Sequence, residues 1–175
     1  MALSHTLLGA AMVILQVLIL VGVANAAPIV ARELLGERLN RPLEGGKTFI
    51  DGAPIFGSTK TVRGLLAPLL MCAAGAALLG LSASFGAGFA AAAMLGDLFS
   101  SFIKRRMGVA SSSPVTGLDQ IPEALFPALA ALPYLDLRAL DVAIIVTLFF
   151  LLDIAVSPVL YRLRIRKTPE PGPRA

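Results

Sequence analysis

The chain has 175 residues, a formal net charge of +4 and a mean hydropathy of +0.82. Hydrophobic residues make up 57% of it and charged residues 15%, whereas soluble domains are about 45–50% apolar and about 25% charged. This composition excludes a disordered chain, a nucleic-acid-binding arm and a disulfide-stapled secreted domain. It indicates an all-α integral membrane protein with a single membrane domain, over residues 1–163.

The sequence contains one cysteine, Cys72, and one histidine, His5. Cys72 therefore has no partner in the chain for a disulfide, and no set of Cys and His ligands exists for zinc. A bound metal ion would have to take oxygen ligands, which favours Mg²⁺.

Uncharged apolar stretches give the candidate membrane spans, since a bilayer core about 30 Å thick requires about 20 mostly apolar residues per helix. The stretch 64–96 would form one helix about 50 Å long, so we expect two helices joined by a turn at 82–86. The fourth span is short and contains Pro127 and Pro133. The five predicted spans are 6–27, 65–81, 86–103, 121–135 and 139–161, with a long loop at 28–63 and a disordered, proline-rich tail at 164–175.

The basic residues predict the orientation. All of them except Arg138 fall in segments that alternate to one side of the five spans. Lys and Arg are enriched in cytoplasmic loops, so this side is predicted to be cytoplasmic. The N-terminus is then outside and the C-terminus cytoplasmic, in the inner (cytoplasmic) cell membrane. Only an odd number of spans fits this alternation, which supports the weak fourth helix.

Small residues in the first and third spans have specific interpretations. Ala24-Asn25-Ala26 matches a signal-peptide cleavage pattern, but no Lys or Arg precedes it and the apolar run is long, so we expect a retained helix. Gly88, Ala92 and Gly96 repeat every four residues, which predicts a close approach by another helix.

The long loop ends in a glycine-containing segment, 57–64, where Lys60 and Arg63 precede the second span. One interpretation is that both side chains extend to the membrane surface as anchors. The other is a phosphate cradle. Glycines would let the backbone approach the anion, a helix N-terminus would offer N–H groups, and the two cations would supply charge.

A second polar group lies at the end of the third span. Helical spacing places Asp97, Ser100, Ser101 and Lys104 on one face, with Asp97 about two turns inside the cytoplasmic end. A carboxylate at that depth is costly unless it is paired or binds a cation. Asp97 is therefore either in a salt bridge with Lys104 or a Mg²⁺ ligand, with the basic residues 104–106 holding the phosphates.

A third polar group lies where the loop 108–121 leads into the fourth span. Asp119 would cap this helix, with Glu123 favoured in its first turn by the helix dipole. Alternatively, Asp119 is a second carboxylate that faces Asp97 at the same membrane depth. Two further residues, Asn25 and Asp153, lack a clear role. Asn25, near the cytoplasmic end of the first span, either lines the same cytoplasmic opening as Asp97 and Asp119 or caps backbone groups. Asp153, inside the fifth span, is a functional candidate or a hydrogen-bond partner of a neighbouring helix.

At these residues the chain resembles the CDP-archaeol synthase family of integral membrane cytidylyltransferases, which are related to phosphatidate cytidylyltransferases. The block at 101–106 is the most specific, and the matches run in order from Asn25 to about Glu123. They are Ala-Asn-Ala-Ala-Pro at 24–28, Asp-Gly at 51–52, Ile-Phe-Gly at 55–57, Lys-Thr-Val-Arg-Gly at 60–64, Gly-Asp at 96–97, Ser-Phe-Ile-Lys-Arg-Arg-Met-Gly at 101–108 and Asp-Gln at 119–120.

The resemblance implies a reaction at the cytoplasmic face that joins CTP to a lipid phosphate and releases pyrophosphate, with Mg²⁺ as cofactor. In it, a lipid phosphate oxygen attacks the α-phosphorus of CTP. The implied metal ligands are Asp97 and Asp119, with Glu123 as a further candidate, and Lys104 joins them as a catalytic residue. The implied phosphate-binding residues are Lys60, Arg63, Lys104, Arg105 and Arg106, supported by Asn25, Asp51 and Thr61.

Two departures from the family pattern concern the lipid more than the reaction. Val62 stands where the family usually has an aromatic residue, and Pro122, followed by Glu123, stands where it usually has a second Asp after Asp-Gln and one further residue. Glu123 is a candidate replacement for that acid. These changes suggest a divergent branch that acts on a lipid other than the archaeal ether lipid.

Two other functions compete with the enzyme. One is a non-catalytic membrane protein that binds lipid head groups or a partner through its basic loops. The other is a small transporter subunit that uses Asp153, although polar residues are otherwise scarce near the membrane midplane. The expected partners are CTP, a lipid phosphate and the lipid bilayer, with no nucleic acid, and the sequence leaves open whether the chain forms a homodimer.

Overall fold

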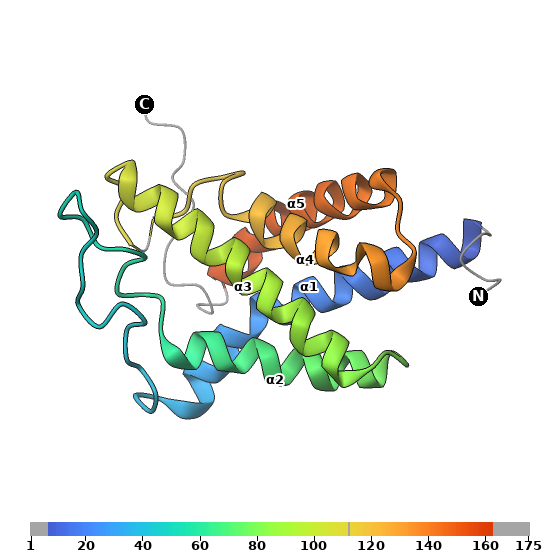
Figure 1. Ribbon diagram of the computed structural model, residues 1–175, viewed down its shortest axis with the longest axis horizontal. Helices are drawn as coiled ribbons and strands as arrows, with labels where there is room; N and C mark the ends of the chain where they lie inside the picture. Colours follow the sequence, from blue (N-terminus) through green and yellow to red (C-terminus); the bar gives the residue numbers. More distant parts are fainter. Residues whose placement is uncertain (1–6, 112, 163–175) are drawn as a thin grey trace.

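The computed structural model describes residues 7–111 and 113–162. Within these ranges the chain forms five α-helices, close to the five predicted positions (Figure 1). They are α1 (Leu7–Leu35), α2 (Val62–Leu78), α3 (Ala83–Arg106), α4 (Gln120–Leu135) and α5 (Ala139–Arg162). Helices that follow one another in the chain pack together, and α5 also packs against α1. The predicted disordered tail lies outside the described residues.

The first helix is longer than predicted. It passes through Pro28 and ends at Leu35, eight residues beyond the expected boundary at residue 27. The apolar run stops there, but the following turn contains good helix formers and an ion pair between Arg32 and Glu33. The helix ends where Gly36 adopts a left-handed conformation, with φ of 53°, and donates its N–H to the Arg32 carbonyl.

Helix caps set the starts of α2 and α3, and both begin three residues before the predicted positions. The Thr61 hydroxyl accepts a hydrogen bond from the Gly64 N–H at 3.2 Å. The Ser82 hydroxyl accepts one from the Phe85 N–H at 3.1 Å. The turn predicted at 82–86 is therefore wrong in position, because Ser82 is the cap of α3 and the turn precedes it.

Two glycines of α3 allow neighbouring backbones to approach closely. A Cβ at Gly96 would overlap the carbonyl oxygen of Pro122 in α4, and a Cβ at Gly86 would overlap that of Cys72 in α2. The predicted close approach is confirmed at Gly96. It is wrong at Gly88, which is exposed and faces open space. The contact at Gly96 brings the first turn of α4 beside Asp97.

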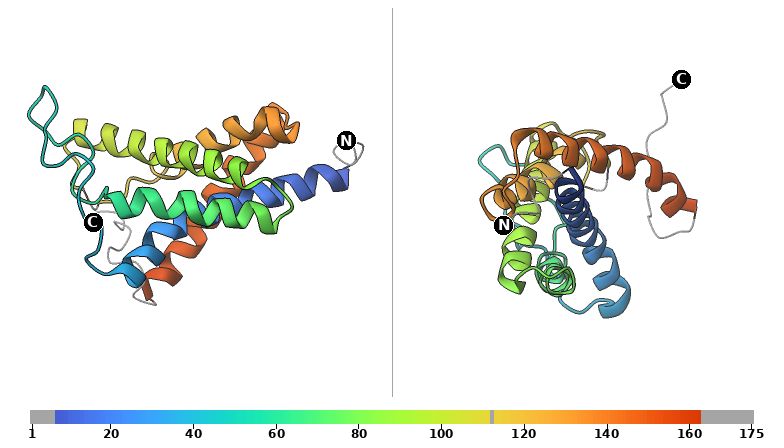
Figure 2. Two further views of the ribbon diagram at one scale, coloured as in Figure 1. Left: turned by 60° about the horizontal axis from the view of Figure 1, so that its bottom comes forward. Right: turned by 90° about the vertical axis from the view of Figure 1, so that its right-hand side faces the viewer.

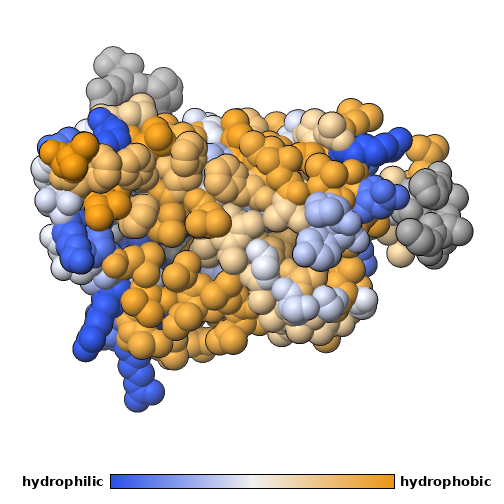
Figure 3. Space-filling model, viewed as in Figure 1, coloured by the Kyte–Doolittle hydropathy of each residue, from blue (hydrophilic) through white to orange (hydrophobic). Residues whose placement is uncertain are grey.

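The distribution of polarity suits a membrane protein. Three helices in the described ranges are long and apolar enough to cross a bilayer: α1, α3 and the stretch Ala139–Ser157 of α5. The helix α2 is apolar but shorter, and α4 has 16 residues with two prolines. A hydrophobic belt covers the middle of the visible face, and hydrophilic residues gather towards its ends (Figure 3).

The loop at residues 36–61 lies at one end of the molecule, beside the C-terminal end of α3. The start of α1 lies at the opposite end, and Figure 2 shows the same arrangement from two further sides. The loop is folded by turns and by isolated bridges between Pro42 and Thr61 and between Thr48 and Pro54. This arrangement brings Lys60 over the end of the helix bundle, where the charged residues of α3 and α4 lie.

Candidate active site

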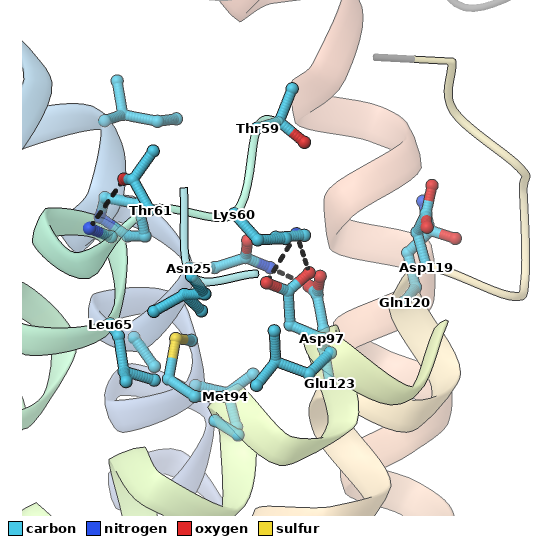
Figure 4. A pocket seen from close by; sticks show the side chains of 18 of the residues that line it. Asn25, Thr59, Lys60, Thr61, Leu65, Met94, Asp97, Asp119, Gln120 and Glu123 are labelled. Atoms are coloured by element: carbon cyan, nitrogen blue, oxygen red, sulfur yellow. Dashed lines mark hydrogen bonds and ion pairs between the residues drawn. The ribbon is translucent and has the colours of Figure 1, made fainter. Parts of the chain in front are cut away.

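A cavity of about 340 Å³ opens at the loop-covered end of the bundle. Three helices, α1, α3 and α4, and both polar loops contribute residues that the sequence predicted for the site, whereas α2 contributes Gly64 and Leu65 and α5 contributes Asp153 (Figure 4). The predicted site residues that line it are Asn25, Lys60, Thr61, Asp97, Lys104, Asp119 and Glu123. The apolar part of the wall consists mainly of Val21, Ala24, Pro28, Ile29, Leu43, Leu65, Ala93, Met94 and Leu98.

Lys60 forms the central ion pair of the cavity. Its Nζ donates to both carboxylate oxygens of Asp97, at 2.5 and 2.6 Å. Both side chains are about one-fifth exposed, 22% for Lys60 and 19% for Asp97. The salt bridge expected between Asp97 and Lys104 is therefore wrong, because the loop brings Lys60 closer. Lys60 points into the cavity and does not extend outward as an anchor.

Glu123 lies beside Asp97 in the same part of the cavity (Figure 4). The Asn25 side-chain amide donates to Glu123 Oε2 at 2.8 Å, which links α1 to α4. Lys60 also lies within electrostatic range of Glu123. Two carboxylates therefore face one ammonium group within the cavity, an arrangement that favours an added cation.

Lys104 and Asp119 form a second ion pair on another part of the wall. Lys104 Nζ lies 2.6 Å from Asp119 Oδ1, and it also donates to the Ser113 carbonyl at 3.4 Å. Asp119 Oδ2 accepts a hydrogen bond from the Val115 N–H at 2.9 Å. The expectation that the Asp119 side chain caps α4 is wrong, since it makes no cap hydrogen bond.

Gln120 is a cavity residue that was absent from the predicted site. It is 4% exposed, and its Nε2 donates to Asp153 Oδ2 at 2.9 Å. The expectation that Asp153 bonds a neighbouring helix is confirmed by this contact. The position of Gln120 directly after Asp119 in the Asp-Gln match was a signal that could have identified it.

Three predicted arginines and Asp51 do not line the cavity but hold the loops. Arg63 donates to the Gly36 carbonyl and to Asn40 Oδ1.

Arg105 and Arg106 hold the loops near the end of α3. Arg105 donates to Ser111 Oγ and to the Ala110 carbonyl. Arg106 lies 2.7 Å from Asp51 Oδ2 and stacks on the rings of Phe49 and Phe102.

Glu44 is a second residue that the sequence analysis missed. Its Oε2 accepts hydrogen bonds from the N–H groups of Phe56 and Gly57, at 2.7 and 3.0 Å. These contacts fix the part of the loop that leads into Lys60. No local pattern marks Glu44, because the two N–H groups lie 12 and 13 residues further along the chain.

The oxygen donors of the cavity fit Mg²⁺ if substrate phosphates and water supply its remaining ligands. Among the described residues, no three acidic, His or Cys side chains gather closely enough to hold a metal alone. However, Mg²⁺ is commonly held by one or two carboxylates, with the remaining ligands from substrate phosphates and water. The adjacent carboxylates of Asp97 and Glu123 match that requirement.

Comparison with known proteins shows the family to which the chain belongs. The CDP-archaeol synthase family profile matches residues 74–169, more than half of the chain. This chain belongs to the CDP-archaeol synthase family. The family expected from the sequence is confirmed, and with it the class of CTP-dependent cytidylyltransferase acting on a lipid phosphate.

Individual CDP-archaeol synthases match most of the chain. That of Pyrobaculum islandicum is 32% identical over 164 residues, covering 84% of this chain and 91% of the relative. The synthase of Sulfurisphaera tokodaii is 33% identical over 136 residues, covering 73% of this chain and 81% of the relative. A solved structure of an intramembrane enzyme for archaeal membrane lipid biosynthesis matches with a TM-score of 0.70 and 28% identity, covering 82% of this chain and 91% of that one.

Proposed function

We propose that the cavity at the loop-covered end is where this CDP-archaeol synthase family member transfers a cytidylyl group from CTP to a membrane lipid phosphate. The observation that carries the proposal is the convergence of two lysine–carboxylate pairs, Lys60 with Asp97 and Lys104 with Asp119, on one cavity with Glu123. A site for polyphosphate and metal requires cations for the phosphates and carboxylates for the metal, and this cavity contains both.

The two ion pairs compensate the charges of the site while no substrate is bound. Each lysine neutralises a carboxylate that would otherwise be buried without a counter-charge, which is costly. When CTP enters, Lys60 and Lys104 would turn to its phosphates. Asp97, Glu123 and Asp119 would then be free to hold Mg²⁺, which when bound supplies positive charge that neutralises the triphosphate.

The reaction requires little covalent work from the protein. An oxygen of the lipid phosphate forms a bond to the α-phosphorus of CTP, and the bond from that phosphorus to the bridging oxygen breaks. Pyrophosphate leaves with the electron pair of that bond. A phosphate monoester has a second pKa of about 6, so it is already an anionic nucleophile at neutral pH and needs no general base. Catalysis is then positioning and charge neutralisation by Lys60 and Lys104.

One part of the cavity wall is polar and another part is apolar, which suits two substrates of different polarity. CTP is soluble, whereas the lipid phosphate has apolar chains that remain in the bilayer. The apolar part of the wall, which includes Val21, Leu65 and Met94, supports an approach of the lipid from the membrane side. The polar loops support an approach of CTP from the cytoplasm. In this proposal the chain crosses the cell membrane five times, its N-terminus is outside, and the active site lies on the cytoplasmic face.

A non-catalytic role in binding lipid head groups has less support. It would explain basic residues on exposed loops, but Arg63, Arg105 and Arg106 are engaged with loop carbonyls, Ser111 and Asp51. It would not explain why carboxylates lie beside the two lysines inside a cavity.

The test is a transfer assay with purified protein in liposomes, α-labelled CTP and Mg²⁺. The panel of acceptors contains an archaeal ether-lipid phosphate, phosphatidate and a polyprenyl phosphate. We expect label in the lipid fraction, and pyrophosphate in equal amount, with at least one acceptor. Label in no lipid, with protein that is folded and inserted, would overturn the proposal. The preferred acceptor also decides whether Val62 and Glu123 mark a change of lipid.

A further inference from the structure

The carboxyl group of Asp153 has no part in the proposed transfer, yet it lies inside an apolar helix and lines the cavity. We infer that Asp153 is a positioning residue that orients the Gln120 amide and, through it, the turn that presents Asp119. This inference rests on the proposed function for the importance of Asp119, but the contacts that carry it are independent of any substrate.

The Gln120 side chain bridges two partners of opposite character. Its Nε2 donates to Asp153 Oδ2 at 2.9 Å, while its Oε1 accepts from the Gly117 N–H at 2.7 Å. A side-chain amide can be turned over so that its oxygen and nitrogen exchange places. A carboxylate accepts hydrogen bonds and does not donate them, so Asp153 permits only the orientation in which the Gln120 oxygen faces Gly117.

The contact with Gly117 holds the turn before α4. Gly117 has φ of +87°, and its carbonyl accepts from the Ile121 N–H at 3.0 Å. On the other side of Gly117, the Val115 N–H donates to Asp119 Oδ2 at 2.9 Å, and the Val115 carbonyl accepts from the Asp119 N–H at 3.1 Å. Asp119 Oδ1 is left directed at Lys104. The path therefore runs from Asp153 through Gln120 and the turn to Asp119.

This role also explains why the acid lies on α5. The turn leads directly into α4, and α4 packs against both α3 and α5. Lys104 holds Asp119 from the α3 side, and Asp153 holds Gln120 from the α5 side. The two contacts together fix the start of α4 from opposite neighbours.

The experiment compares four variants with the full-length protein in detergent. Asp153→Leu removes the acceptor, and Gln120→Glu places two carboxylates against each other. The double substitution Gln120→Glu with Asp153→Asn restores the pattern in reverse, because the new carboxylate can accept from both Gly117 and the new amide. Asp141→Asn is the control, since Asp141 is an acid of the same helix that bonds Arg138 at its other end.

Hydrogen–deuterium exchange of the Val115 and Gly117 amides is the first readout and requires no substrate. We expect faster exchange in Asp153→Leu and Gln120→Glu, and exchange near that of the wild type in the double variant and in Asp141→Asn. Unchanged exchange in both single variants would overturn the positioning role. If Asp153→Leu fails to fold, Gln120→Glu and its rescue by Asp153→Asn still decide the question.

The second readout is equilibrium binding of CTP with Mg²⁺ in the absence of lipid, so that no turnover occurs. We expect affinity about tenfold weaker in the two single variants and largely restored in the double variant. Wild-type affinity in both single variants would contradict the inference. If the wild type itself does not bind CTP while amide exchange responds as expected, the positioning stands and the proposed function falls.

Discussion

Lys60, near the end of a 26-residue loop, pairs with Asp97 of α3, which lies 37 positions further along the chain, and Lys60 Nζ donates to both carboxylate oxygens at 2.5 and 2.6 Å. The contact matters because it is made by a loop residue and a bundle residue. It closes the loop over the cavity and at the same time compensates the charge of a carboxylate inside the helical bundle.

Removal of the Lys60 charge is therefore expected to disable the site. Lys60→Met leaves Asp97 and Glu123 side by side without their nearest cation, and CTP loses a phosphate contact. We expect kcat/KM for CTP to fall by about 10²–10³-fold, the usual effect of losing one charge-stabilising donor. Steady-state kinetics in liposomes checks this. Lys47→Met, an exposed lysine of the same loop, is the control and should retain wild-type kinetics; equal losses in both variants would exclude a specific role for Lys60.

Removal of divalent metal should stop turnover. The cavity offers two adjacent carboxylates, which is enough for Mg²⁺ only when phosphates complete its ligands. We expect EDTA to lower the rate by at least about 100-fold and Mg²⁺ or Mn²⁺ to restore it, with Ca²⁺ less effective because it prefers longer and more numerous oxygen contacts. Full activity after exhaustive chelation would show that Asp97, Glu123 and Asp119 do not act as metal ligands.

The contact between the two polar loops can be tested at Gly57. Its φ is +99°, and a Cβ there would overlap Ser111 Oγ in the loop that leads to Asp119. Gly57→Ala should turn the Ser111 hydroxyl away from Arg105 and press on Ser111 Cβ, which would lie 3.1 Å from the new methyl group, and lower kcat/KM by about tenfold, within the range of about 1–3 kcal/mol for an overpacked contact. Gly52→Ala is a matched control with φ of +78° and open space around it. Similar losses in both variants would attribute the effect to backbone strain alone.

The close approach of α3 and α4 can be tested at Gly96. Gly96→Ala places a methyl group against the Pro122 carbonyl, which is backbone and cannot rotate away. We expect a destabilisation of about 1–3 kcal/mol, seen as a lower Tm, and reduced activity because Glu123 moves from Asp97. Gly88→Ala, in open space on the same helix, should not lower Tm. A lower Tm in Gly88→Ala alone would contradict the packing described.

The sequence predicted the helices well and their boundaries less well. Uncharged apolar stretches located the helices because burial in lipid or protein requires such stretches. The ends were misplaced where polar residues continue a helix, as at Arg32 and Glu33, or where a single cap residue decides the start, as at Thr61 and Ser82. Caps and polar turns contribute about 1 kcal/mol each, too little to stand out in hydropathy.

The sequence also located most of the charged wall of the cavity, because the C-terminal part of α3, with Asp97 and Lys104, and the start of α4, with Asp119 and Glu123, lie at the same end of the helix bundle. It did not identify the pairs. Lys60 pairs with Asp97, and Lys104 pairs with Asp119. The course of the loop 36–61, which Glu44 fixes through the N–H groups of Phe56 and Gly57, decides which lysine reaches which acid. Such contacts join residues that are distant in sequence, so spacing along the chain does not report them.

The most direct test of the central claim is the transfer of the cytidylyl group from α-labelled CTP to the lipid acceptor by the wild type, Asp97→Asn and Asp119→Asn in parallel liposome preparations. Asp136→Asn, an exposed acid at the end of α4, is the control. We expect the wild type and the control to label lipid at equal rates, and each site variant to be slower by at least about 100-fold while still inserted and folded. Wild-type rates in Asp97→Asn and Asp119→Asn would contradict the assignment of the cavity as the site of cytidylyl transfer.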